Sequence, residues 1–229
     1  MVSAHGYANC IAWVDLTNKK IEYREVDEED ARKFIGGRGL GGRIILKNEV
    51  GKDPLAPKKV IAVLNGLLTG TTVPMSGRIV AVARSPLTGV FADTHAGGWA
   101  GAAMKWAEFD AVVMHGASDQ PVYLLVKNET VSIEPADGLW GKTPEEAYHL
   151  LVQKYGKAVQ FYGIGPAGEN LVKFANLMHF GEGALGRASG RTGLGAVFGS
   201  KKVKALVIIG DEKTCPSPPT PKNTKESVR

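Results

Sequence analysis

The sequence predicts an α+β fold with a substantial antiparallel β-sheet. Strand-like runs rich in valine and isoleucine are mixed with segments of helical composition, and the two kinds do not alternate in a regular strand–helix–strand order. Two pairs of strand-like runs are separated by only three turn residues, and a connection this short joins antiparallel neighbours. With 229 residues, 44% of them hydrophobic and 22% charged, the chain is long enough to bury the core of one large domain.

The N-terminal part is predicted to contain a hairpin and two short helices. Half-buried apolar runs flank three turn residues within 11–26, which is typical of a β-hairpin. Asp27 precedes a segment with acidic residues in its first turn and basic residues near its end, as expected of a capped helix. Gly36 and Gly37 are expected to end this helix, and a second helix is expected over roughly 40–47.

The central part is predicted to be mainly β-structure. Strands are expected within 58–66, 77–84 and 109–116, and a second hairpin within 121–135. The segment 97–107 has helical composition and interrupts this series of strands.

The C-terminal third is predicted to add one helix and three strands. Thr143, a following proline and Glu146 form the pattern of a capping box, so a helix is expected to run to about Tyr155. The strands are expected at 159–163, 173–178 and 203–209. The segment 186–202 contains too much glycine for the interior of a strand or helix. The tail 211–229, rich in proline, lysine, threonine and serine, is expected to be disordered.

Composition excludes several classes of function. Of the net charge of +5, the segment 213–229 carries +3, so the body lacks the basic face of a nucleic-acid-binding protein. Cys10 and Cys215 do not form a CxxC motif, so this chain alone builds neither a cysteine zinc site nor an iron–sulfur cluster. One disulfide remains possible, but two lone thiols favour a reducing cytoplasm. No apolar run is long enough to span a membrane, and the protein is expected to be soluble.

Two glycine-rich segments match nucleotide-binding motifs only formally. GRGLGG at 37–42 has the spacing of a dinucleotide fingerprint, but no strand precedes it and no suitable acid follows about 20 residues later. A helix end and a close turn are therefore the favoured interpretation. The segment 193–201 has the wrong spacing for a P-loop.

Glycine-rich loops that carry arginine or histidine recur near predicted strand ends. They include MSGR at 75–78, DTHAGGW at 93–99 and the segment 186–202, where two arginines lie four residues apart. Taken singly, Arg78 fits a salt-bridged residue at the start of a strand, and a lone histidine such as His95 is more often structural. Taken together, the loops favour a large phosphorylated cofactor, since guanidiniums bind phosphate bidentately and stay charged. No catalytic triad, metal-ligand cluster or carboxylate pair offers another chemistry.

Seven segments, in order, resemble the N-terminal domain of the tungsten-dependent aldehyde:ferredoxin oxidoreductase family. They are GGRGLGG, NGLLTGTTVPMSGR, ARSPLTG, HAGGWAGAAMKWAEFDAVVMHGASDQPVYL, LWGKTPEEAY, GIGPAGENLVKFANLM and GRASGRTGLGAVFGSKKVKALVIIG. The resemblance runs from about Tyr7 to Gly210 and implies a domain over 1–210. In that family the domain consists of two packed, mostly antiparallel sheets with short helices. They form a saddle that cradles a metal bound by two molybdopterins, whose phosphates are bridged by Mg²⁺.

The resemblance implies six cofactor-binding residues: Arg78, His95, Gly97, Arg187, Ala188 and Gly190. Arg78 would hold a pterin phosphate and lie between the pterin and an iron–sulfur cluster. His95 and Gly97 would line the pterin, and the backbone carbonyl of His95 would reach Mg²⁺. His95 stands where the family often has asparagine, which leaves a side-chain contact in doubt but not the carbonyl contact.

The second half of the implied site comes from the glycine-rich segment. Arg187, Ala188 and Gly190 would contact the second pterin, and the Ala188 carbonyl would be the other ligand of Mg²⁺. The resemblance names no catalytic residue in this chain.

The activity implied by the resemblance is the oxidation of aldehydes to carboxylates at a tungsten or molybdenum centre, with electrons passed through a [4Fe–4S] cluster to ferredoxin. The family's cluster-binding cysteines and helical domains have no counterpart in this sequence. A helical partner chain or missing C-terminal domains are therefore expected, and a homodimer is possible. The alternative is a non-catalytic pterin carrier or a structural relic of the fold.

Overall fold

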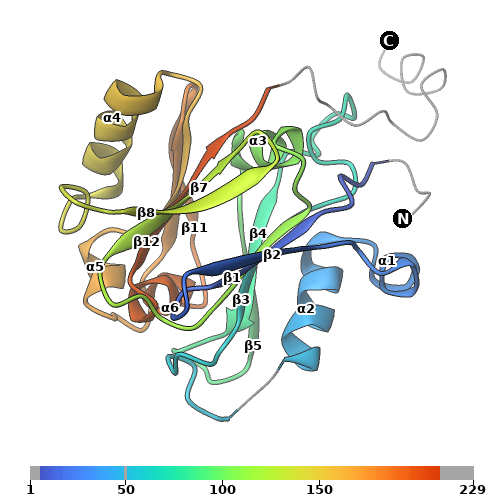
Figure 1. Ribbon diagram of the computed structural model, residues 1–229, viewed down its shortest axis with the longest axis horizontal. Coiled ribbons are helices and arrows are strands. Elements are labelled where there is room, and N and C mark those ends of the chain that lie inside the picture. The colour runs from blue at the N-terminus through green and yellow to red at the C-terminus, as the bar shows by residue number, and fades with distance from the viewer. Residues whose placement is uncertain (1–5, 49–50, 212–229) are drawn as a thin grey trace.

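Two six-stranded β-sheets pack face to face in the computed structural model, which describes residues 6–48 and 51–211 (Figure 1). Sheet A has the strand order β2-β1-β6-β3-β4-β5, and sheet B has the order β11-β10-β9-β12-β7-β8. In each sheet one neighbouring pair is parallel, β1 with β6 and β7 with β12, and the other pairs are antiparallel. The predicted α+β fold is thus confirmed.

The strands of sheet A are β1 (Ile11–Asp15), β2 (Lys20–Arg24), β3 (Ile61–Asn65), β4 (Ile79–Arg84), β5 (Phe91–Ala96) and β6 (Ala111–His115). Those of sheet B are β7 (Val122–Lys127), β8 (Thr130–Pro135), β9 (Gln160–Gly163), β10 (Leu177–Gly181), β11 (Ala184–Ser189) and β12 (Val203–Ile209). The helices are α1 (Glu28–Phe34), α2 (Gly37–Lys47), α3 (Ala100–Trp106), α4 (Pro144–Tyr155), α5 (Pro166–Glu169) and α6 (Leu194–Ser200).

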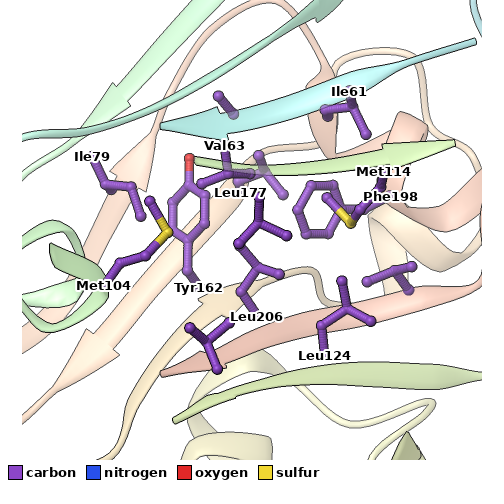
Figure 2. Packing of buried hydrophobic residues seen from close by; sticks show 14 of the residues in the cluster. Ile61, Val63, Ile79, Met104, Met114, Leu124, Tyr162, Leu177, Phe198 and Leu206 are labelled. Carbon is purple, nitrogen blue, oxygen red and sulfur yellow. The ribbon is translucent and has the colours of Figure 1, made fainter. Parts of the chain in front are cut away.

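The main core lies between the two sheets (Figure 2). Alternate residues of β3 show how it is built, because Ile61 and Val63 point into this core while Ala62 and Leu64 point to the other face of sheet A. Helices α3 and α6 contact strands of both sheets and so lie between them. The buried side chains of Met104 from α3 and Phe198 from α6 belong to the same core.

Helices also cover the outer face of each sheet. Side chains of α1 and α2 pack with the outward-facing residues of β3, β4 and β6, and side chains of α4 pack with those of β7, β9 and β12. Burial on both faces explains why the central strands are continuous apolar runs. None of the helices in the two described ranges has the length and apolar character needed to cross a bilayer.

Several predicted elements are confirmed. The first hairpin is β1–β2, the second is β7–β8, and β12 covers the predicted 203–209. The side chain of Asp27 caps α1, and Thr143 and Glu146 form the capping box of α4.

Other expectations were wrong. The helix predicted from residue 40 begins at Gly37, and the strand predicted at 173–178 lies at 177–181. Residues 93–96 of the loop expected at 93–99 belong to the strand β5, and the glycine-rich segment contains the last four residues of the strand β11 and the whole helix α6. Both missed strands are sheet edges, which need only one hydrogen-bonded neighbour and so tolerate weak strand propensity. Of the tail expected at 211–229, residues 212–229, with Cys215, lie outside the described residues.

The capping box of α4 gives a direct test of local stability. The Thr143 hydroxyl accepts from the Glu146 amide at 3.3 Å, and Glu146 Oε2 accepts from the Thr143 amide at 2.8 Å. We expect Thr143→Ala to lower the free energy of unfolding by about 1 kcal/mol, measured by urea denaturation. Thr143→Ser keeps the hydroxyl and should stay close to wild type; an equal loss in both variants would exclude the cap as the cause.

Candidate functional site

The predicted site residues gather where the edges of the two sheets meet. The edge strand of sheet A is β5 and the edge strand of sheet B is β11, and these two strands contact each other although they are far apart in the sequence. His95 lies in β5, Gly97 follows it, Arg187 and Ala188 lie in β11, and Gly190 follows that strand. The structure therefore brings five of the six predicted residues onto two adjacent strand edges.

Arg78, the sixth residue, lies at the same end of sheet A as Gly97. It immediately precedes β4, whose first residue, Ile79, is paired with Ala96 in β5. Arg78 and Gly97 line one cavity of about 620 Å³, together with Trp99 and Trp106. The close approach of α3 to this loop is possible because Gly101 has no side chain: a Cβ there would lie 3.2 Å from the Arg78 carbonyl oxygen.

The arginines of the described residues fall into two groups. Five bond to acceptors of the protein itself: Arg24, Arg32, Arg38, Arg43 and Arg84. Within the described part of the chain, the side chains of Arg78, Arg187 and Arg191 have no ion pair or hydrogen bond of this kind, and all three are exposed. These three guanidiniums remain available for an anion, and all of them belong to the loops and the edge strand around this site.

The side chain of His95 is engaged by the protein. Its Nε2 lies 2.7 Å from Asp93 Oδ2, and Arg38 of α2 approaches the same carboxylate oxygen at 3.9 Å. The neighbouring Ala92 and Ala96 point into the core between the sheets, so His95 points to the opposite face. The imidazole is thus a hydrogen-bonded structural group. The backbone of His95 belongs to the edge strand β5.

The glycines of the segment 186–202 serve two purposes. A Cβ at Gly193, Gly195 or Gly199 would lie 1.8, 2.5 or 1.9 Å from a backbone carbonyl oxygen of the chain itself, so these three permit close backbone contact around α6. A Cβ at Gly190 would meet no atom within 4 Å, and the same holds at Gly97. Gly190 and Gly97 thus leave open space beside the facing strands.

His179 is a residue of this region that the sequence analysis missed. It lies in β10, is fully buried, and its Nδ1 is 2.9 Å from the Gly97 carbonyl oxygen in the other sheet. Its neighbour in the register of β11 is Arg187. Burial, assisted by the positive charge of Arg187 and opposed by the bond to Gly97, lowers the pKa of His179 to about 4. The ring is therefore neutral at pH 7.

Metal-ligating side chains do not cluster in the described ranges. No group of three or more histidine, cysteine, aspartate or glutamate side chains there could hold a metal ion. Cys10 is a half-buried free thiol, and burial, with the negative charges of Asp110 and two glutamates, raises its pKa to about 11. A thiol with this pKa stays protonated at neutral pH and is a poor metal ligand.

The known proteins that this chain resembles in sequence and fold are oxidoreductases. Residues 11–210 match the family described as aldehyde ferredoxin oxidoreductase, N-terminal domain, and the chain belongs to this family. A tungsten-containing aldehyde ferredoxin oxidoreductase of Pyrococcus abyssi is 42% identical over 210 residues, which cover 91% of this chain and 34% of that protein. The enzyme of the same description from Thermococcus kodakarensis is 42% identical over 202 residues, 87% of this chain and 33% of that protein.

More distant relatives share the domain. The WOR-like subunit of an aliphatic sulfonate oxidoreductase of Pyrococcus furiosus is 33% identical over 224 residues, covering 90% of this chain and 35% of that protein. A solved structure, the active-site complex of benzoyl coenzyme A reductase with 1,5-dienoyl-CoA, has a TM-score of 0.83 and 30% identity, covering 90% of this chain and 31% of that one. The chain spans about a third of the length of the curated relatives it matches.

The buried state of His179 predicts a dependence of stability on pH. The unfolded chain takes up a proton on this histidine near pH 6.5, whereas the native protein does so only near pH 4. Above pH 6.5 this histidine is neutral in both states, and the free energy of unfolding is not reduced by its titration. As the pH falls from 6.5 toward 4, the unfolded state binds more protons and the free energy of unfolding decreases. At pH 5 we expect the wild type to have lost about 2 kcal/mol more than His179→Asn, relative to pH 7, in urea denaturation. Equal losses in the wild type and in His179→Asn between pH 7 and pH 5 would contradict this prediction.

Proposed function

We propose that this chain is the cofactor-binding domain of a tungsten or molybdenum bis-molybdopterin oxidoreductase that oxidises aldehydes to carboxylates. The observation that carries the proposal is the position of three guanidiniums that have no acceptor among the described residues, those of Arg78, Arg187 and Arg191, around two facing strand edges. Family membership supports the chemistry, since the curated relatives are described as tungsten-containing aldehyde ferredoxin oxidoreductases.

The residues present fit such a group. Pterin phosphates need charged donors, and Arg78 and Arg187 are exposed arginines that no described acceptor occupies. A large planar ligand also needs room beside the backbone, and a Cβ at Gly97 or Gly190 would find open space. We assign one pterin to Arg78 and Gly97, and the other to Arg187 and Gly190.

Backbone carbonyls would hold the bridging Mg²⁺. This ion prefers oxygen ligands, and His95 and Ala188 lie on the two edge strands that contact each other. Because the His95 imidazole is bound to Asp93, the backbone is the part of this residue that is left for the ion. A contact through the backbone carbonyl does not depend on whether this position holds histidine or the asparagine that is frequent in the family.

The bound metal centre would supply the redox step, accepting two electrons as an aldehyde becomes a carboxylate, with a [4Fe–4S] cluster and ferredoxin as the onward carriers. This chain's own residues bind and orient. The guanidiniums balance the phosphate charge, and neutral His179 avoids adding a buried positive charge next to Arg187. The cysteines for the cluster would come from another part of the enzyme.

A further part of the enzyme is expected to cover the cavity lined by Arg78. Relatives are about three times as long as this chain, and this cavity is bordered by the exposed apolar side chains of Met75 and Trp99. The helical domains, as a partner chain or as a continuation of this one, would bury these side chains. The proposed setting is the reducing cytoplasm, where Cys10 remains a thiol.

The site is tested by removing one guanidinium. In the protein isolated from its native host, we expect Arg187→Ala to bind the cofactor about 10- to 100-fold more weakly, because a hydrogen bond to a charged group is worth about 1.5–3 kcal/mol. The measurements are tungsten, molybdenum and iron by elemental analysis and pterin by fluorescence, with circular dichroism to confirm the fold.

The control is Arg32→Ala, which removes an exposed arginine of α1 that pairs with Glu28 away from the site. It should keep wild-type metal and pterin. Full tungsten in Arg187→Ala would contradict the assignment of Arg187. Metal and pterin without iron in the wild type would favour a cofactor carrier, and the absence of both would indicate a fold that has lost its site.

A further inference from the structure

The buried side chain of His179 joins the two halves of the proposed site. His179 of sheet B lies 2.9 Å through Nδ1 from the carbonyl oxygen of Gly97, which follows the edge strand of sheet A. On its own sheet, His179 is directly opposite Arg187 in the pairing of β10 with β11. The imidazole therefore contacts one proposed cofactor residue and is the cross-strand neighbour of another.

The position of the ring proton follows from its two partners. The Gly97 carbonyl oxygen can only accept, so Nδ1 must carry the proton and donate. Nε2 lies 3.0 Å from Oε1 of the Gln160 side-chain amide, and with the ring proton on Nδ1 both of these atoms are acceptors. A half-turn of that amide offers Nε2 an N–H donor, at the expense of the 3.2 Å bond from Gln160 to the Ala158 carbonyl. A neutral ring with the proton on Nδ1 can thus satisfy both sides.

Gln160 packs against the Nε2 side of the His179 imidazole. Gln160 is buried, and its amide occupies the space beside Gly181: a Cβ at Gly181 would lie only 1.9 Å from Gln160 Oε1. The imidazole thus has a fixed neighbour on the Nε2 side and a fixed acceptor on the Nδ1 side. Its bond to Gly97 sets the distance between the end of β5 and the strand that carries Arg187.

We propose that His179 is a positioning residue of the cofactor site, which fixes the Gly97 backbone relative to Arg187 through its Nδ1–H donor. The inference rests on the proposed function, because Gly97 and Arg187 are assigned there to the two pterins. His179 does not touch the cofactor. Its role is to keep the open side of Gly97, which lines the cavity with Arg78, at a constant separation from β11.

A second contact between the two sheets, at the opposite end of the strands of sheet A, provides a control for the His179 contact. Lys201, just before β12 of sheet B, donates through Nζ to the carbonyl oxygens of Gly116 and Pro57 at 3.0 Å each. Gly116 follows β6 of sheet A, so this contact also joins the two sheets through a buried side chain and backbone oxygens. Lys201→Met removes it without altering any residue near Gly97.

The test compares His179→Leu, His179→Asn and Lys201→Met in the protein isolated from its native host. The readouts are the rate at which tungsten and pterin are lost on dilution and, separately, the free energy of unfolding. We expect His179→Leu to lose tungsten about fivefold faster than wild type, as for one lost hydrogen bond. Lys201→Met should lose stability but retain tungsten. His179→Asn, whose amide N–H stands in the place of Nδ1–H, should restore wild-type retention.

Several results would overturn the inference. Wild-type retention in His179→Leu would show that the donor is not needed, while Arg187→Ala could still support the proposed function. Equal losses in His179→Leu and His179→Asn, or in Lys201→Met, would reduce His179 to a general stabilising residue. A wild type without tungsten, molybdenum or pterin would overturn both proposals.

If His179→Leu does not fold, a second variant tests the inference. Gly181→Ala displaces the Gln160 amide next to the imidazole ring and should accelerate the loss of tungsten. An unchanged rate of loss in this variant would contradict the inference.

Discussion

Burial of apolar side chains between sheets A and B is the constraint on which the rest of the structure depends. Residues from strands of both sheets and from α3 and α6 share this core, and many of them are completely excluded from solvent. Each fully buried aliphatic or aromatic side chain contributes about 1.5–3 kcal/mol, so the face-to-face arrangement is strongly favoured. Because the sheets are held in this way, β5 and β11 are brought together without having to pair with each other by a ladder of their own.

The positions of the helices between the sheets depend on the same constraint. Helix α3 begins three residues after Gly97, and Gly101 lets its first turn approach the backbone of Arg78. Helix α6 follows Arg191 and is held by backbone contacts at Gly195 and Gly199. The loop that carries Arg191 therefore enters a helix anchored in the core, and the loop that ends in Arg78 packs against another such helix at Gly101. A flexible loop could present the same side chains, but not at a constant separation.

The basic side chains of the interior and those of the proposed site have different surroundings. Buried lysines are neutralised or hydrogen-bonded within the protein: Lys105 pairs with Asp110, Lys204 pairs with Glu169, and Lys201 bonds to two carbonyl oxygens. Burial lowers the pKa of Lys201 to about 8, which reflects the cost of a cation without a carboxylate. Arg78 and Arg187 have no such partner among the residues that the structure describes, and both are exposed. Exposed arginines next to glycines that leave open space are suited to binding an external anion.

The sequence by itself determined the local elements and the family. Capping at Asp27 and Thr143, the short hairpin turns and the continuous apolar strands all depend on neighbouring residues, so they could be predicted. The arginines and glycines of the site could be singled out by their motifs, because residue types and spacing are properties of the chain. Strands β5 and β11 could not be predicted in this way, since their strand conformation comes from pairing with β4 and β10 rather than from their own propensity. The tertiary structure alone decided which glycines pack against backbone and which remain open, and that His179 meets Gly97 across 82 residues, because contacts between distant segments are set by how the two sheets pack.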